Sequence, residues 1–201
     1  MIPAPINQPP PTKWYPPYSM EFPPRDVSDV VHRIAALLRA RNLTLAVSEA
    51  ACGGLLSAYL VSVPGASDFY IGGKLLYSLK QRLRLSGWLD QEIQSYVGPS
   101  ELVALKLART TRYELGLTYV LSETGYAGPS TDLHLGAPAG ADAVGTVFLG
   151  VSGPNGEIST VCRTGKNHRS SNMIEFARHG LEFLLEQLEG EEKRTEEKSE
   201  T

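Results

Sequence analysis

Cysteine is scarce in this 201-residue chain, which contains only Cys52 and Cys162. Two cysteines this far apart provide neither a disulfide framework nor the paired spacing of a metal site, so we expect no bound metal. Free thiols are typical of a reducing compartment. The N-terminus also lacks the basic-then-apolar pattern of a signal peptide. We therefore expect a cytoplasmic protein.

Long apolar runs and an excess of one charge are also missing. No apolar run reaches the roughly twenty residues that a membrane span needs. The 19 basic and 22 acidic side chains give a net charge of -3, and they form no Lys/Arg cluster of the kind that binds nucleic acid. We therefore expect neither a membrane nor a nucleic acid as partner. Length and composition are sufficient for one well-packed domain.

The two ends of the chain differ in composition from the middle. Nine of the fourteen prolines lie in residues 1–24, where they alternate with aromatic side chains. Proline at this density prevents helices and strands, so we expect a largely disordered arm, either a leader or a segment that binds a partner. Its last residues, 22–24, should dock beside the first helix. Residues 190–201 are mostly Glu and Lys without apolar residues, which predicts a charged, disordered tail.

Between these ends, over residues 25–189, the apolar pattern alternates between helix and strand. Helices are predicted at 27–42, from 55 onward, from about 99 onward and at 174–188. Strands are predicted at 43–47, 70–78, 119–122, 144–151 and 158–163, the last two forming a hairpin around a turn at 153–156. The order predicts an α/β fold: a three-layer α/β/α sandwich with a mixed, mostly parallel sheet and a late β-hairpin.

The turn between the 43–47 strand and the next helix contains Gly53 and Gly54. Free backbone N–H groups at a helix N-terminus favour an anion, and glycine lets the anion approach closely. The alternative is that these glycines only let the helix pack tightly on the strand. Open α/β sheets bind ligands beyond the carboxyl ends of their strands. We expect residues 49–54, 77–82, 123–129 and 166–169 to meet there.

Five short motifs follow one another along the chain: Glu49-Ala-Ala-Cys-Gly-Gly54, Ser62-Val-Pro-Gly-Ala-Ser67, Gly72-Gly73 with Tyr77-Ser78, Gly125-Tyr-Ala-Gly-Pro129 and Val144-Gly-Thr-Val147. Over about residues 27–188, this series resembles the CinA C-terminal domain family. Members are nicotinamide-nucleotide amidases, which hydrolyse nicotinamide mononucleotide to nicotinate mononucleotide and ammonia. The resemblance implies a small phosphorylated nucleotide as ligand, a homodimer and no cofactor.

The resemblance also assigns catalytic positions, and this chain departs from two of them. The serine nucleophile falls on Ala50, and the lysine that follows Tyr77 falls on Arg82, with Lys80 close by. Alanine has no attacking atom, and arginine is always protonated. Cys52 is the best replacement nucleophile, because a thiol at a helix N-terminus has a lowered pKa. Ser48 is a weaker candidate.

Ligand contacts are expected from residues around the same strand ends. Carboxylates accept ribose hydroxyls, and an arginine pairs with phosphate. The expected ligand-binding residues are Glu49, Gly53, Gly54, Ser78, Glu123, Gly125, Ala127, Gly128 and Arg169. Three hypotheses follow: a nucleotide-binding protein with weak or no hydrolysis, an amidohydrolase that uses Cys52, or a scaffolding module that uses the proline arm.

Overall fold

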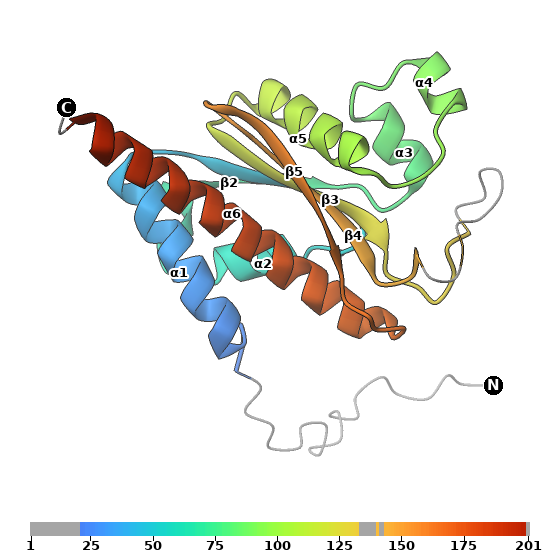
Figure 1. The fold of residues 1–201 in the computed structure, drawn as a ribbon, viewed down its shortest axis with the longest axis horizontal. Helices are drawn as coiled ribbons and strands as arrows, with labels where there is room; N and C mark the ends of the chain where they lie inside the picture. The colour runs from blue at the N-terminus through green and yellow to red at the C-terminus, as the bar shows by residue number, and fades with distance from the viewer. Residues whose placement is uncertain (1–20, 133–139, 141–142, 200–201) are drawn as a thin grey trace, which may run out of the picture.

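The computed structural model describes residues 21–132, 140 and 143–199. A five-stranded sheet lies between two layers of helices (Figure 1), in the strand order β2-β1-β3-β4-β5. The strands are β1 (Leu45–Glu49), β2 (Tyr70–Leu75), β3 (Tyr119–Tyr126), β4 (Thr146–Gly153) and β5 (Gly156–Arg163). β1 pairs in parallel with β2 and β3, whereas the β3–β4 and β4–β5 pairs are antiparallel. The predicted α/β fold class, with a mixed sheet and a late hairpin, is confirmed. The sheet is not mostly parallel, since two of its four strand pairs are antiparallel.

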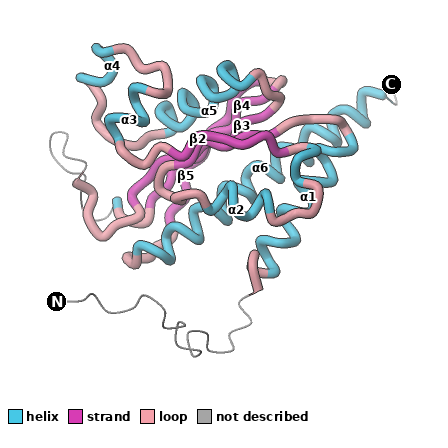
Figure 2. The backbone as a smooth tube through the Cα atoms, turned by 180° about the vertical axis from the view of Figure 1, so that it is seen from behind, coloured by secondary structure: helices cyan, strands magenta, loops and turns pink. Residues whose placement is uncertain are grey.

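Helices cover both faces of the sheet (Figure 2). One face is covered by α1 (Arg25–Ala40), α2 (Leu55–Val61) and α6 (Arg169–Ser199), and the other by α5 (Glu101–Leu115) with the short helices α3 (Leu79–Arg84) and α4 (Asp90–Gln94). The larger core lies under α1, α2 and α6, where Val31, Ile34 and Leu38 form the buried stripe of α1. A 3-10 turn, η1 (Ala66–Asp68), precedes β2. No helix in the described ranges is long and apolar enough to cross a membrane.

The connections of β1 place a crevice at its carboxyl end. The chain passes from β1 through α2 on one face to β2, and then through α5 on the opposite face to β3, on the other side of β1. Open sheets bind ligands where the strand order reverses in this way. Gly73 permits the close pairing of β1 and β2, since a Cβ there would lie 2.2 Å from the Val47 carbonyl oxygen. A glycine within this strand thus serves a close approach of two backbones.

Three elements extend differently from the predictions. β2 ends at Leu75, and β3 continues to Tyr126, so that Glu123 and Gly125 lie in the sheet instead of a loop. α6 begins at residue 169 and runs through most of the expected disordered tail to Ser199. Glu and Lys are good helix formers, and the Glu191 carboxylate, which accepts a hydrogen bond from the Tyr119 hydroxyl, fixes this extension to the domain. The expectation of a disordered tail is therefore wrong for residues 190–199.

The arm before the first helix is described only from residue 21. The Phe22 ring packs on Tyr59 of α2, with 5.4 Å between the ring centroids. Its expected docking therefore involves the second helix, next to the start of α1. The expectations for residues 1–20 lie outside the described residues.

Candidate functional site

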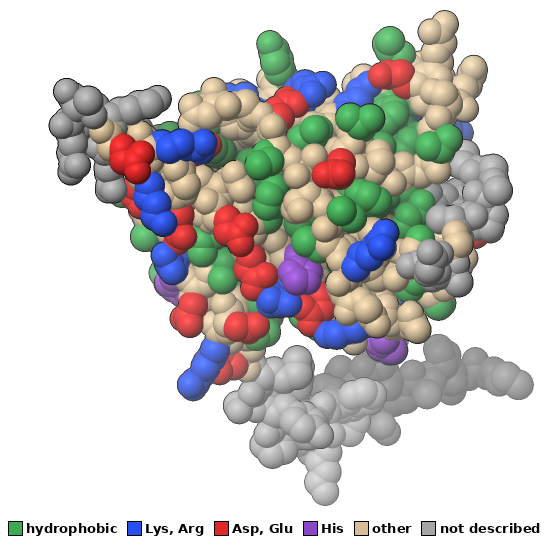
Figure 3. Space-filling view, in the orientation of Figure 1, with side chains coloured by type: hydrophobic (Ala, Val, Ile, Leu, Met, Phe, Trp, Pro, Cys, Tyr) green, Lys and Arg blue, Asp and Glu red, His purple; other side chains and the backbone are tan. Residues whose placement is uncertain are grey.

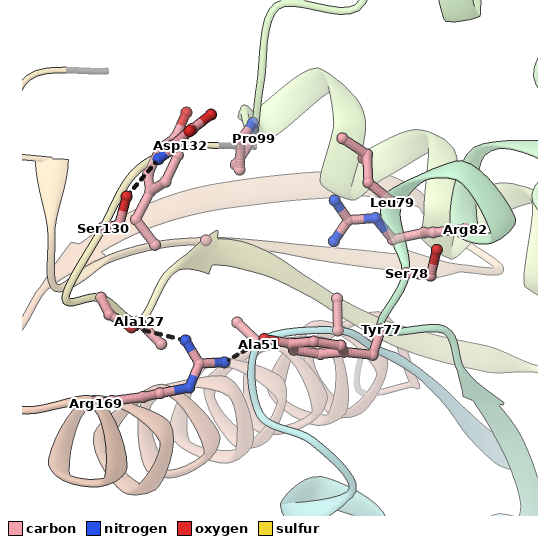
Figure 4. A pocket seen from close by; sticks show the side chains of 14 residues that line it. Ala51, Tyr77, Ser78, Leu79, Arg82, Pro99, Ala127, Ser130, Asp132 and Arg169 are labelled. Atoms are coloured by element: carbon pink, nitrogen blue, oxygen red, sulfur yellow. Dashed lines mark hydrogen bonds between the residues drawn. The ribbon is translucent and has the colours of Figure 1, made fainter. Parts of the chain in front are cut away.

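A cavity of about 320 Å³ opens beyond the carboxyl ends of β1, β2 and β3 (Figure 4). It brings together segments from the ends of all three strands and from the start of α6. Of the residues predicted from the sequence, the cavity is lined by Ala50, Tyr77, Ser78, Arg82, Gly125, Ala127, Gly128 and Arg169. Six predicted residues do not line it: Glu49, Cys52, Gly53, Gly54, Lys80 and Glu123.

Glu49 caps α2 from the end of β1. Its buried carboxylate accepts hydrogen bonds from the backbone N–H groups of Gly54 at 2.9 Å, Leu56 at 3.0 Å and Ser57 at 2.9 Å, and from the Ser57 hydroxyl at 2.5 Å. The helix N-terminus is thus occupied by an anion of the chain itself, as its dipole and unpaired donors favour. The predictions that Glu49 accepts ribose hydroxyls and that the Gly54 amide binds a ligand are wrong in this structure.

Glu123 holds the preceding part of the same turn. Its Oε1 accepts hydrogen bonds from the N–H groups of Ala50 at 2.5 Å and Cys52 at 2.8 Å. The side chain is fully buried, and burial raises the pKa of Glu123, with a further contribution from Glu49. Glu123 is therefore a second internal anchor of the turn instead of the predicted ribose ligand. The backbone N–H groups of Cys52 and Gly54 are therefore already used within the chain.

The Cys52 thiol is fully buried at this turn. Burial raises the pKa of Cys52 well above its ordinary value, and the charges of Glu123 and Glu49 raise it further. The predicted lowering of its pKa is wrong, because burial, together with the two carboxylates, outweighs the effect of the N-terminus of a seven-residue helix. The neighbouring Gly53 lies against α6, because a Cβ at this position would be 3.0 Å from the Met173 methyl group. Both glycines have positive φ, so they serve the turn geometry.

Arg169 spans the cavity from the first residue of α6. Its guanidinium group donates to the Gly128 carbonyl at 2.7 Å and to the Tyr77 hydroxyl at 2.8 Å (Figure 4). It also lies 5.7 Å from the centre of the Tyr77 ring. Both acceptors are neutral, and no carboxylate of the described residues forms an ion pair with Arg169. A guanidinium has five N–H donors, so donors remain for a ligand.

Arg82 points into the cavity from α3 (Figure 4), whereas Lys80 is exposed and does not line it. The Arg82 side chain is buried, with a relative exposure of 6%. Its Nη2 donates a long hydrogen bond of 3.4 Å to the Tyr96 hydroxyl. The suggestion that Lys80 replaces the family's lysine at the site is therefore wrong, since two positions along a short helix turn it to solvent.

Several contributing residues were not predicted from the sequence. Ser130 and Asp132 line the cavity, and Asp132 is its acidic residue within the described ranges. Asn172 of α6, fully buried, donates from Nδ2 to the carbonyls of Ala127 at 3.0 Å and Lys166 at 3.1 Å, and so fixes the β3 end relative to Arg169. An isolated Asn in a helix gives no sequence signal of this role. The described part of the chain contains no group of His, Cys, Asp and Glu that could hold a metal.

Sequence comparison identifies relatives of this chain. The family model of the CinA C-terminal domain matches residues 27–188. A CinA-like protein from Synechocystis is 32% identical over 168 residues, which make up 82% of this chain and 39% of that protein. A CinA-like protein from Myxococcus xanthus is 36% identical over 155 residues, which make up 75% of this chain and 34% of that protein. The chain thus spans less than half the length of these relatives.

Solved structures share the fold. The competence/damage inducible protein CihA from Agrobacterium tumefaciens superposes with a TM-score of 0.74 at 24% identity, covering 85% of this chain and 99% of that one. A CinA superfamily protein from Enterobacter cloacae gives 0.72 at 22% identity, covering 81% and 92%. At these identities the superpositions establish the fold alone. Because the family model matches most of the chain, the protein belongs to the CinA C-terminal domain family.

Proposed function

We propose that this protein binds a pyridine mononucleotide in the cavity and hydrolyses it weakly or not at all. One observation carries the proposal: the cavity of a CinA C-terminal domain has two arginines and, at the position of the family's serine nucleophile, Ala50. Its volume of about 320 Å³ is at the lower end of ligand pockets. This size suits a mononucleotide better than a dinucleotide.

Arg169 is the proposed phosphate contact. Its guanidinium is oriented by the Gly128 carbonyl and the Tyr77 hydroxyl, and its remaining donors match the geometry of phosphate oxygens. Glu49 and Glu123 do not line the cavity, whereas Asp132 does, so we assign the ribose hydroxyls to the Asp132 carboxylate. A charge-assisted hydrogen bond contributes roughly 1.5–3 kcal/mol, so removing the phosphate should weaken binding about 10-fold to 150-fold.

The loss of hydrolysis follows from the side chains at the reacting centre. Ala50 offers no nucleophile, and Arg82 cannot act as a base because its guanidinium stays protonated. The alternative amidohydrolase would use Cys52, but this thiol is buried outside the cavity lining with a raised pKa. Ser48, the weaker candidate, is also buried and does not line the cavity. The geometry therefore favours binding over catalysis.

The test combines calorimetry with ammonia release. Nicotinamide mononucleotide should bind and its riboside should bind much more weakly, while wild-type ammonia release stays far below about one turnover per second. Ala50→Ser should raise the rate slightly. Ala50→Ser with Arg82→Lys should raise it a further 10²- to 10⁴-fold, the usual contribution of a general base. Ala51→Ser, at a neighbouring alanine that also lines the cavity, is the matched control and should not raise the rate.

Two results would reject this function. Wild-type turnover at one per second or faster would show that hydrolysis persists, and its loss in Cys52→Ala would identify the thiol as nucleophile. Absence of any saturable heat at millimolar nucleotide would set the binding free energy weaker than about -4 kcal/mol. The scaffolding hypothesis would then take precedence.

A homodimer is a second proposal, supported by the outer face of α5. Leu102 and Tyr113 are 79% and 87% exposed and lie eleven residues apart, which places them on the same side of the helix. Figure 3 shows apolar side chains gathered over the region of α5 and β5, away from the charged surface of α1 and α6. Light scattering should give twice the chain mass, and Leu102→Lys with Tyr113→Lys should give the monomer. A monomeric wild-type protein would refute this proposal.

A further inference from the structure

Arg82 is a buried cation whose hydrogen-bonding capacity is largely unused. Only 6% of the residue's surface is exposed, and its guanidinium faces the cavity (Figure 4). Its Nε is buried and has no hydrogen-bond partner within the described ranges. The Tyr96 hydroxyl, at 3.4 Å from Nη2, is a neutral and distant acceptor. A buried charge is costly unless an opposite charge and hydrogen bonds compensate it, so this side chain lacks an anionic partner.

The surrounding charges do not supply that partner. Burial raises the pKa of Glu123 and the charge of Arg82 opposes that rise, but the two side chains form no ion pair in the described part of the chain. Glu123 Oε1 is bound to the turn, and its buried Oε2 has no hydrogen-bond partner within the described residues. Arg169, also on the cavity wall, adds a second positive charge. Two guanidinium groups and, within the described ranges, the Asp132 carboxylate thus line one small cavity. The positive charges outnumber the negative one, which favours an anionic ligand whose negative groups can reach both arginines.

We propose that Arg82 makes this cavity select pyridine nucleotides that carry a ring carboxylate over the corresponding carboxamides. This inference rests on the proposed function, because Arg169 is taken as the phosphate contact. A guanidinium presents parallel N–H donors that match both oxygens of a carboxylate. A carboxamide offers one acceptor oxygen, and its NH₂ group would face N–H donors. The cavity then prefers the acid form of the nucleotide to the amide that the family's amidases hydrolyse.

Ala50 contributes to this selectivity. It lines the same cavity as Arg82, and its methyl side chain provides neither an acceptor for the amide NH₂ nor a hydroxyl that would compete for Arg82. The two departures from the family pattern therefore act in the same direction. Ala50 removes the hydroxyl that would attack the amide. Arg82 replaces a lysine by a guanidinium that stays protonated and can pair with the carboxylate of the acid.

The test compares nicotinate mononucleotide with nicotinamide mononucleotide by calorimetry on the full chain at neutral pH. The two probes share ribose and phosphate, so their difference isolates the ring substituent. The wild-type protein should bind the acid at least tenfold more tightly, equivalent to about 1.4 kcal/mol. Arg82→Gln should remove this preference, whereas Arg169→Gln should weaken both ligands to a similar extent. Lys80→Gln removes an exposed cation of the same helix outside the cavity, and should change neither affinity.

Each outcome decides the inference. Equal wild-type affinities, or a preference for the amide, would overturn it while leaving the proposed nucleotide binding intact. Retention of the preference in a folded Arg82→Gln variant would also overturn it. If neither nucleotide binds, the proposed function and this inference fail together. Circular dichroism checks that the variants fold, and the wild-type comparison alone is decisive should Arg82→Gln not fold.

Discussion

Replacing Glu49 with glutamine tests whether an internal carboxylate holds the turn at the site. Glu49 is 1% exposed, and each carboxylate oxygen accepts two hydrogen bonds from the start of α2. Glutamine has nearly the same shape, but only one of its two terminal atoms accepts hydrogen bonds. The substitution therefore leaves one or two backbone N–H groups facing an NH₂ group, without creating a large cavity.

The loss of stability in Glu49→Gln can be estimated from the hydrogen bonds that the substitution removes. A buried donor without a partner costs about 1–3 kcal/mol. Removing a negative charge near a helix N-terminus costs a further 0.3–1 kcal/mol, or about 2 kcal/mol where it is partly buried. We therefore expect Glu49→Gln to lower the free energy of unfolding by about 2–5 kcal/mol. Domains of this size have roughly 5–15 kcal/mol in total, so the effect should be large.

Urea unfolding followed by circular dichroism measures this difference. Asp26→Asn is the matched control, because Asp26 is an exposed acid in the first turn of α1 and that helix has no side-chain cap. This control should cost no more than about 1 kcal/mol, the helix-dipole contribution alone. An equally small effect in Glu49→Gln would refute the view that the Glu49 carboxylate takes the place of a ligand anion at α2.

Three further predictions concern the same turn and the start of α6. Gly54→Ala should cost about 1–2 kcal/mol of stability, because φ is +100°, but should leave nucleotide affinity unchanged, which calorimetry can check. In Cys162→Ser protein, Cys52 should react with a thiol reagent only as fast as the chain unfolds; rapid labelling of the native protein would contradict its burial. Hydrogen bonds from Lys166 and Arg178 lower the pKa of Glu175 to about 2. The stability that Glu175 contributes is therefore present above its ordinary pKa of 4.5, and it is lost as the pH falls towards 2. Glu175→Gln should therefore be less stable than the wild type at pH 6 but not near pH 2 in urea titrations.

Much of the fold was predictable because local patterns agreed with tertiary packing. The apolar stripe of α1 and the hairpin turn at 153–156 each depend on neighbouring residues, and both occur as predicted. Gly73 was predictable for a similar reason, since a glycine within a strand weakens pairing unless another backbone comes close. The ordered helix after residue 189 was not predictable, because it depends on the long-range contact between Glu191 and Tyr119.

The site was only partly predictable, for a different reason. Residue order placed Ala50, Tyr77, Arg82 and Arg169 near the strand ends, and the structure brings them to one cavity. Sequence does not state which way a carboxylate points. Glu49 and Glu123 are conspicuous near the strand ends, and both turn into the protein because unpaired N–H groups are there to be satisfied.

The same two carboxylates explain how the turn keeps its geometry with alanine at position 50. The turn at residue 50 is fixed by the bond from the Ala50 N–H group to Glu123 and by the cap that Glu49 forms on α2. Neither interaction involves the side chain at position 50, so alanine there leaves the turn geometry unchanged. The cavity wall and the arginines on it depend on other elements, α3 and α6. Under the proposed function, chemistry and binding therefore rest on separate sets of contacts, and the loss of hydrolysis does not require the loss of nucleotide binding.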